Sequence, residues 1–239
     1  MLLSKYMKKI ISFSGGKDST ALLLLMIKKA IPFDEIIFCD TGMEYPEVYN
    51  HIDLIKKRLK LNITRLQSKK SFEYWLADHV KQKGKNKGKK GYGWPDHRVR
   101  WCAKSLKINV IKSYLQKYNS KENKIIEYHG ITWDERSRMK KNNDGRNIEY
   151  PLCKYKYSQK DTLSLCLKNG YDWEGLYSKF SRANCYCCPL QTLNDLKMLY
   201  LSYPKLWKKM KMLDKGSWRK FRKDYTILEL EGKFNGKNN

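Results

Sequence analysis

Short apolar stretches alternate with longer stretches of helical pattern in the first half of the chain. The short stretches have the character of buried β-strands and cover residues 8–13, 35–40, 61–66 and 124–129. Helical patterns lie between them at residues 19–29, 46–60, 71–81 and 102–118. Strands that alternate with helices are typical of an α/β fold. We therefore predict a Rossmann-like, twisted parallel sheet with helices on both faces.

The turn after the first predicted strand is the most informative stretch of the chain. It reads Ser-Gly-Gly-Lys-Asp-Ser-Thr, and it lies between an apolar strand and an Ala- and Leu-rich helix. Two glycines allow close approach of the backbone to a ligand, and a helix start adds unpaired N–H groups. This context predicts a phosphate-binding nest and disfavours a plain connecting turn. Its residues are Ser14, Gly15, Gly16, Lys17, Asp18, Ser19 and Thr20.

A second polar turn follows the second predicted strand. Asp40, Thr41 and Gly42 fall at the carboxyl end of that strand, where ligands of parallel sheets bind. An acid there is suited to hold Mg²⁺ or a ribose hydroxyl. The alternative is an Asp-Thr turn that caps the next helix.

The charge balance adds a candidate partner. The chain has 239 residues and a formal net charge of +26, from 50 Lys and Arg against 24 Asp and Glu. Nucleic acid, either tRNA or DNA, is the first candidate, because phosphates reward many basic side chains. A general enrichment in lysine, from an AT-rich genome, is the alternative. The lysine–glycine loop at residues 81–91 is expected to be mobile when free, and either to close on phosphates or to be solvated surface.

Several classes of protein are disfavoured. No apolar run reaches the ~18 residues of a membrane span, and the short basic start has no secretory pattern. The seven cysteines are irregularly spaced, which favours thiols or metal ligands in a reducing cytoplasm. We expect a cytoplasmic protein with no membrane partner.

The chain changes character near residue 150. Helical patterns at residues 158–169 and 192–212 flank a Cys-x-Cys-Cys-Pro cluster. We predict a nucleotide-binding domain over residues 1–150 and a helical C-terminal region, with a cysteine-rich metal site, over residues 151–239. Cys185 and Cys188 have chelating spacing, whereas Cys39, Cys153 and Cys166 are interpreted as core cysteines.

Taken together, these motifs resemble the phosphoadenosine phosphosulfate reductase family of the PP-loop, or N-type ATP pyrophosphatase, superfamily. The turn matches the PP-loop, and the Asp-Thr-Gly-x-Glu-x-Pro-Glu segment follows it at the family's distance. An Arg-x-Cys element, a Gly-x₄-Glu-x-x-Arg-like segment and an Arg-x-x-Cys-x-x-Cys-Pro element extend the resemblance over most of residues 8–190.

The resemblance implies the adenine nucleotide α-hydrolase-like fold and a set of site residues. ATP and Mg²⁺ are expected at the PP-loop with Asp40, Thr41 and Gly42, and Lys17, Asp18 and Asp40 are the catalytic candidates. Candidates for binding a substrate phosphate or sulfate are Arg98, Arg100, Glu135, Arg136, Arg138 and Arg182. Candidate ligands of Zn²⁺ or a 4Fe–4S cluster are Cys102, Cys185, Cys187 and Cys188.

The implied activity is adenylation of a substrate, for sulfur transfer to a nucleic acid or nucleotide, with a sulfur donor protein as partner. A sulfonucleotide reductase and an ATP sulfurylase-like enzyme are the alternatives within the family. The intact loop and the lack of a Glu-Cys-Gly-x-His segment after Cys188 favour the first interpretation over a reductase. A nucleic acid-binding or nucleotide-sensing module without catalysis is the alternative outside enzymes.

Overall fold

The computed structural model of the chain describes residues 7–84, 86–118, 125–139, 147–182 and 185–236. Lys124, Ala183 and Asn184, which belong to the predicted strand and cysteine motif, lie outside these ranges. The chain forms two compact units, each built from three separate stretches. The first unit comprises Met1–Cys39, Pro46–Leu66 and Val110–Leu176, and the second comprises Asp40–Tyr45, Gln67–Asn109 and Tyr177–Asn239. The predicted boundary at residue 150 falls inside the third stretch of the first unit.

The first unit contains a five-stranded sheet of order β3-β2-β1-β4-β5. Its strands are β1 (Lys8–Phe13), β2 (Glu35–Asp40), β3 (Ile63–Gln67), β4 (Ile125–His129) and β5 (Asn147–Glu149). Pairing is parallel between β1 and β2, β1 and β4, and β4 and β5. The predicted α/β fold is confirmed. The bounds of β1 and β2 match the prediction, whereas β3 begins two residues later than expected.

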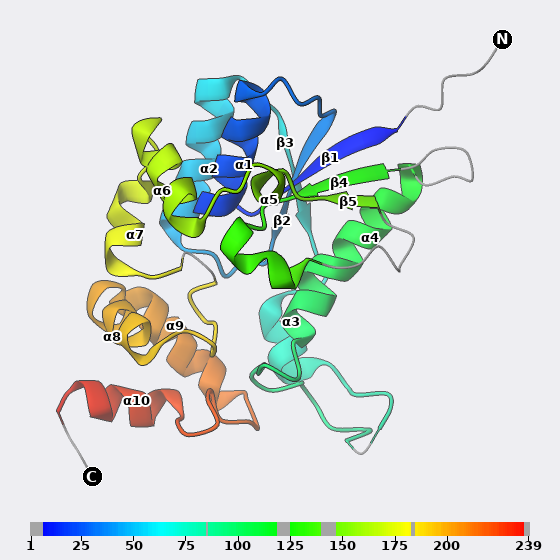
Figure 1. Cartoon of the computed structure of the whole chain (residues 1–239). Coiled ribbons are helices and arrows are strands. Elements are labelled where there is room, and N and C mark those ends of the chain that lie inside the picture. Colours follow the sequence, from blue (N-terminus) through cyan, green and yellow to red (C-terminus); the bar gives the residue numbers. More distant parts are fainter. Residues whose placement is uncertain (1–6, 85, 119–124, 140–146, 183–184, 237–239) are drawn as a thin grey trace. The chain divides into compact units, whose positions relative to one another are not determined.

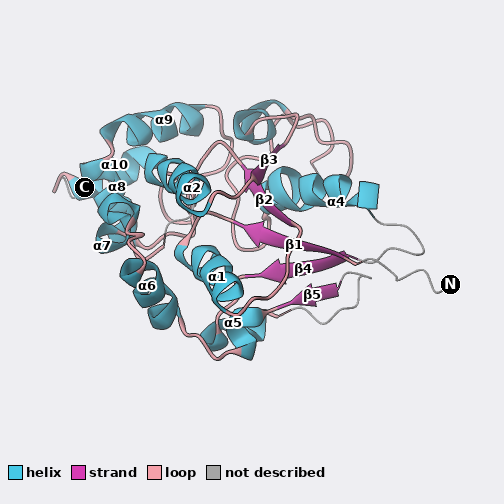
Figure 2. Ribbon diagram, turned by 90° about the horizontal axis from the view of Figure 1, so that it is seen from above, coloured by secondary structure: helices cyan, strands magenta, loops and turns pink. Residues whose placement is uncertain are grey.

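Helices cover both faces of this sheet (Figures 1 and 2). They are α1 (Lys17–Lys28), α2 (Pro46–Leu59), α4 (Asn109–Leu115), α5 (Pro151–Lys154) and α6 (Gln159–Lys168). Residues of α4 pack on one face against Ile10, Ile37 and Cys39. On the other face α1 contacts α5 and α6. Because α1 is buried on nearly every side, its Ala-Leu run is apolar without a polar stripe.

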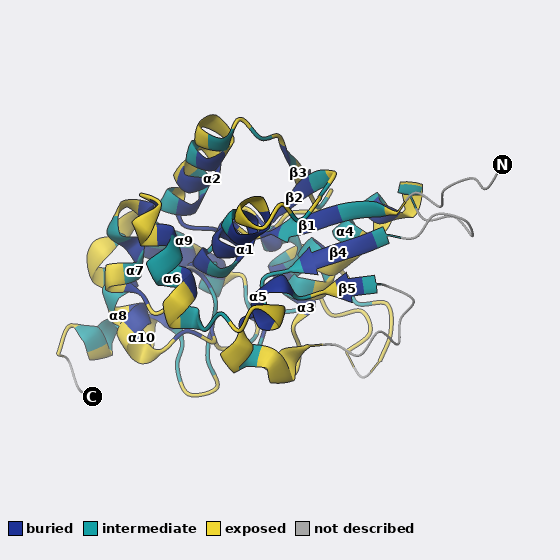
Figure 3. Cartoon of the chain, turned by 45° about the horizontal axis from the view of Figure 1, so that its top comes forward, coloured by how far each residue is buried: buried dark blue, intermediate teal, exposed yellow. Residues whose placement is uncertain are grey.

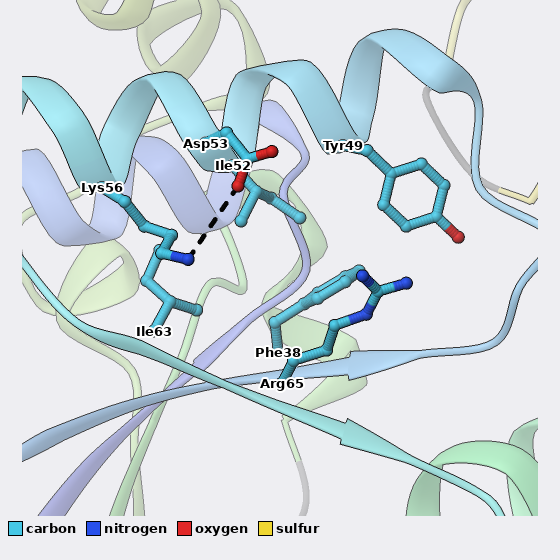
Figure 4. Close-up of a pocket in the computed structure, with 7 residues that line it drawn as sticks. All are labelled: Phe38, Tyr49, Ile52, Asp53, Lys56, Ile63 and Arg65. Atoms are coloured by element: carbon cyan, nitrogen blue, oxygen red, sulfur yellow. Dashed lines mark ion pairs between the residues drawn. The ribbon is translucent and has the colours of Figure 1, made fainter.

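Burial in the first unit is concentrated in the central strands and in α1. Ile10, Ile11 and Leu22 are fully buried, and α2 exposes its outer side to solvent (Figure 3). A small pocket lies between α2 and strands β2 and β3, and Lys56 Nζ lies 4.0 Å from Asp53 Oδ1 at its rim (Figure 4). Its volume of about 230 Å³ is below the ~300–1,000 Å³ of typical ligand pockets. None of the predicted site residues lines it.

The second unit is helical and irregular. Its main helices are α3 (Trp101–Ala103), α7 (Leu176–Lys179, which begins on the last residue of the first unit), α8 (Leu193–Ser202), α9 (Pro204–Lys215) and α10 (Ile227–Phe234). The helix predicted at residues 192–212 is therefore two helices, α8 and α9. Pro204 explains the break, because a proline disfavours helical geometry in the residue before it.

Two other predicted helices are wrong in part. Over residues 71–81 the helix is limited to residues 72–78, of which Tyr74–Asp78 form a π-helical turn. The carbonyls of Trp75 and Leu76 accept hydrogen bonds from Tyr92 and Gly93 instead of continuing a helix. Residues 102–118 form α3, a π-helical turn at Lys104–Ile108, α4 and a final 3₁₀ turn. Within the described ranges, no helix has the length and apolar character needed to cross a bilayer.

Candidate active site

The turn between β1 and α1 has the geometry of an anion-binding loop. Gly15 adopts φ 76°, and a Cβ there would lie 2.8 Å from Cγ1 of Val48, so both its conformation and its surroundings favour glycine. The Ser19 hydroxyl accepts a hydrogen bond from Ser14 N at 3.1 Å and donates to Gly16 O at 2.9 Å. The turn is therefore fixed by its own side chains at the N-terminus of α1, where backbone N–H groups favour an anion.

Lys17 and Asp18 form a partly buried ion pair at this turn. Lys17 is 8% exposed, and its Nζ lies 2.7 Å from Asp18 Oδ1 and 3.5 Å from Gln159 O. The Thr162 hydroxyl donates to the same Asp18 oxygen at 2.6 Å. α6 thus supplies one further hydrogen-bond partner to each member of the ion pair. A phosphate that approached Lys17 would compete with Asp18 for the ammonium group.

Two aromatic side chains, Trp173 and His51, also support the turn, and neither of them was singled out from the sequence. The Trp173 indole N–H donates to Gly15 O at 2.7 Å, and its ring stacks on His51 with centroids 4.1 Å apart. His51 Nε2 in turn lies 2.9 Å from Thr20 Oγ1. Trp173 and Glu174 both have positive φ, of 51° and 52°, which is strained for residues with a side chain. The strain is tolerated where the indole reaches the turn.

His51 is held as a neutral imidazole. It is 3% exposed, and burial lowers its pKa from 6.5 to about 3. Its Nδ1 atom has no hydrogen-bond partner among the described residues, and the charge of Asp172, which raises the pKa of His51, only partly offsets the effect of burial.

This burial predicts a loss of stability in mild acid. Between pH 6.5 and about 3 the unfolded chain binds a proton at His51 that the folded chain does not. The free energy of unfolding is therefore unaffected by protonation of His51 above pH 6.5 and decreases as the pH falls below it. The decrease is about 2 kcal/mol at about pH 5. Urea unfolding at pH 7.5 and 5 should show a smaller pH dependence for His51→Gln than for the wild type. Equal pH dependence in the two proteins would contradict a buried neutral His51.

The segment after β4 approaches the same turn. A Cβ on Gly130 would lie 2.9 Å from the backbone oxygen of Asp18, so only glycine allows this approach. In the predicted arginine segment, Arg138 pairs with Glu135 at 2.6 Å on the surface, and Arg136 lies over the Trp133 ring at 4.7 Å. Both arginines are exposed and thus accessible to an anion. Their predicted role in binding a substrate phosphate or sulfate stays a prediction.

The Asp-Thr-Gly segment belongs to the second unit, in which it forms a self-supported turn. Asp40 is 1% exposed, and its Oδ1 accepts a hydrogen bond from Gly42 N at 2.8 Å. The Thr41 hydroxyl donates to Glu44 Oε1 at 3.0 Å, and Lys107 Nζ lies 3.4 Å from the same oxygen. The segment thus has the capping contacts of an Asx turn, and its predicted contact with ATP stays a prediction.

The second unit also gathers the four predicted metal ligands, but not as a closed shell. Cys188 N donates to Cys185 O at 3.1 Å, so these two residues share one tight turn. Cys185 Sγ lies 3.6 Å from both Glu44 Oε1 and Thr41 Oγ1. Among the described side chains, no group of three or more His, Cys, Asp or Glu lies close enough to hold a metal ion. The four sulfurs therefore do not form a coordination site in this structure.

The cysteines are neutral thiols in basic surroundings. Burial raises the pKa of Cys185 to about 12 and that of Cys187 well above its usual value. Burial also raises the pKa of Cys188, and the charges of Arg100, Lys107 and Arg182 partly offset this effect. Two predicted arginines, Arg100 and Arg182, thus act electrostatically on Cys188. Both are exposed, as is Arg98. The buried thiols predicted as core, Cys39, Cys153 and Cys166, are confirmed as buried.

Comparison with known proteins assigns the family. A model described as the phosphoadenosine phosphosulfate reductase domain matches residues 8–126. The chain belongs to the phosphoadenosine phosphosulfate reductase-like family. The match covers the phosphate-binding turn, the Asp-Thr-Gly segment and the Arg-x-Cys element. The reductase-like family is a nucleotide-binding family of the PP-loop superfamily, and its members are typically enzymes.

Relatives in the reductase-like family differ in how much of the chain they match. An uncharacterized protein of Methanocaldococcus jannaschii is 26% identical over 207 residues, which are 84% of this chain and 40% of the archaeal protein. The chain thus spans about two fifths of that relative's length. Phosphoadenosine 5'-phosphosulfate reductase of Buchnera aphidicola is 43% identical over 60 residues, 25% of this chain and 24% of the reductase. The crystal structure of phosphoadenylyl-sulfate reductase from Candida auris covers 71% of this chain and 76% of its own, with 14% identity and a TM-score of 0.49.

Proposed function

We propose that the protein cleaves ATP between the α and β phosphates and transfers AMP to a substrate oxygen. One observation carries the proposal: an intact Ser-Gly-Gly-Lys-Asp-Ser loop lies at a helix N-terminus with its lysine buried. A buried ammonium group needs a counter-charge, and Asp18 supplies it at 2.7 Å until a phosphate takes its place.

In the proposed reaction the loop stabilises the leaving group. Attack of the substrate oxygen on the α phosphorus expels pyrophosphate, on which negative charge develops. The backbone N–H groups at the start of α1 and the Lys17 ammonium group, once it has exchanged Asp18 for a phosphate, neutralise that charge. Mg²⁺, when bound, would supply positive charge to the phosphates, and the Asp18 carboxylate would be an oxygen ligand for it at the turn. The role of Asp40 at Mg²⁺ stays a prediction of the sequence.

The second half of the proposal is sulfur transfer to a nucleic acid or nucleotide. A sulfur nucleophile, supplied by a donor protein, would displace AMP from the adenylated substrate. Four cysteines in the second unit and a net charge of +26 support this choice of chemistry and partner. A Zn²⁺ or iron–sulfur site at these cysteines stays a prediction of the sequence. We expect a cytoplasmic enzyme.

A sulfonucleotide reductase is the second candidate, favoured by the local identity to the Buchnera enzyme. It would cleave no ATP and would release sulfite from phosphoadenosine phosphosulfate in the presence of a thiol. The intact loop, which reductases generally carry in a degenerate form, favours adenylation.

Product analysis tests the proposal. Labelled ATP should give AMP and pyrophosphate, and not ADP and phosphate, with release stimulated by unfractionated tRNA or DNA. A donor-dependent incorporation of labelled sulfur into the same nucleic acid would support the transfer step. If the protein binds ATP but cleaves it with neither nucleic acid, the adenylation proposal is wrong. Sulfite release without ATP cleavage would favour the reductase instead.

A further inference from the structure

The lysine–glycine stretch of the second unit is held by backbone hydrogen bonds as a hairpin, although its sequence has no strand pattern. Val80 and Lys90 pair as an antiparallel bridge. Lys81 N donates to Lys89 O at 3.1 Å, and Gly88 N donates to Lys81 O at 2.8 Å. We call residues 80–84 and 86–91, together with Trp218 and Arg219, the basic hairpin; residue 85 lies outside the described ranges and is not part of it.

Three cations of the basic hairpin gather on one indole. Lys81 Nζ lies 4.2 Å and Lys89 Nζ lies 3.8 Å from the centroid of the Trp218 ring, and the Arg219 guanidinium carbon lies 5.8 Å from it. The indole N–H donates to Gly91 O at 3.1 Å, which fixes the ring against the base of the hairpin. Trp218 is still 41% exposed. The cations are therefore held together at the surface by a rigid aromatic platform.

These cations are under-compensated. Asp96 pairs with Arg219, but neither Lys81 nor Lys89 has a carboxylate within 4.0 Å in the part of the chain that the structure describes. Burial lowers the pKa of Lys81, and repulsion from Lys89 and Arg219 lowers it further. A bound anion would relieve that repulsion. The attraction to Trp218 holds the cations in place before an anion arrives.

The form of the anion follows from the shape and the sequence of the basic hairpin. The described residues of the stretch from 81 to 90 include five lysines, and all of them except Lys81 are exposed, so they present a row of charges instead of an enclosed pocket. A row of lysines matches a polymer of phosphates, because each neutralised phosphate releases condensed counterions. A single small anion would use only part of the row.

We propose that the basic hairpin binds the phosphodiester backbone of a nucleic acid, RNA or DNA, and docks the substrate of the proposed reaction. This inference rests on the proposed function for the identity of the substrate. It adds the surface that holds the substrate and a form of recognition that reads backbone charge and not base sequence.

The test is the salt dependence of binding to unfractionated tRNA and to a short DNA duplex, measured without ATP. The double variant Lys81→Ala/Lys89→Ala should bind about tenfold more weakly at about 100 mM salt, and its plot of log affinity against log salt should be shallower by about 1–2. Trp218→Phe should keep most of this slope, because a ring remains under the lysines. Comparing the tRNA and DNA arms shows which polymer is preferred.

Two controls keep the result interpretable. Lys112→Ala/Lys168→Ala removes the same charge from exposed positions of α4 and α6 in the first unit and should leave the slope unchanged. Lys81→Arg/Lys89→Arg keeps the charge and should restore the slope, which separates lost charge from a misfolded hairpin. If both double alanine variants change binding equally, or if the wild type shows no salt-dependent binding, the inference is wrong.

The outcomes for the basic hairpin and for ATP cleavage are separable. Binding is measured without nucleotide and can be repeated in Lys17→Ala, so docking is read independently of cleavage. A normal slope in Lys81→Ala/Lys89→Ala with nucleic acid-stimulated pyrophosphate release would overturn the hairpin inference alone. A reduced slope in that variant, with no ATP cleavage by the wild type, would overturn the proposed function alone.

Discussion

Lys17→Ala is expected to reduce pyrophosphate release from ATP by about 100-fold or more, the size of effect seen when one group that stabilises developing charge is removed. Lys17 is the only lysine of the phosphate-binding turn, and its buried Nζ is held by Asp18 and Gln159 O. Its loss removes a full charge from the place where the pyrophosphate leaves. Stopped assays of labelled pyrophosphate, under saturating ATP, measure the effect.

Two variants make the Lys17 result specific. Lys28→Ala removes an exposed lysine from the last turn of the same helix and should release pyrophosphate at the wild-type rate. Lys17→Arg keeps the charge but places a larger planar group in a buried site, so it should recover only part of the rate. Full activity in Lys17→Ala would mean that this turn does not hold the phosphates of ATP.

Trp173→Ala is expected to destabilise the first unit by about 3–5 kcal/mol, the usual cost of removing a buried tryptophan. The side chain is 2% exposed, stacks on His51 and donates to Gly15 O. Trp173→Phe keeps an aromatic ring but leaves the Gly15 carbonyl without its partner, at a cost of about 1–3 kcal/mol. Urea unfolding gives both values.

The Phe variant also connects stability to the site. Because the Gly15 carbonyl belongs to the turn itself, Trp173→Phe should weaken ATP binding measured by calorimetry. Trp133→Phe changes an exposed indole in the same unit and should alter neither stability nor ATP affinity. If Trp173→Phe binds ATP like the wild type, the indole supports the fold without shaping the turn.

The sheet and the turn could be predicted because local pattern determines them. β1 and β2 each have an apolar centre, Ile10–Ile11 and residues 36–39, and each is followed by a polar turn, so their positions follow from the sequence. β5 has only three residues with one buried side chain, too little for a pattern to show. The π-helical turns could not be predicted, because the apolar pattern of five residues does not distinguish i+5 from i+4 hydrogen bonding.

The supporting side chains of the site lie outside local pattern. Thr162 and Trp173 reach Asp18 and Gly15 across 144 and 158 residues of sequence. His51 lies on the buried face of α2, so its position in the sequence is equally consistent with a core residue and with a residue that supports the site. A motif search has no access to such contacts. The strained Trp173–Glu174 pair, flanked by Asp172 and Gly175, is visible as a sharp turn only in three dimensions.

The alternation of the two units along the chain has a consequence for truncated fragments of the protein. The polypeptide passes from one unit to the other five times, so neither corresponds to a continuous fragment. A fragment ending at residue 150 would keep the glycine turn but lose Gln159, Thr162 and Trp173, leaving Lys17 and Asp18 without their neighbours. Such a fragment is expected to be insoluble or unable to bind ATP.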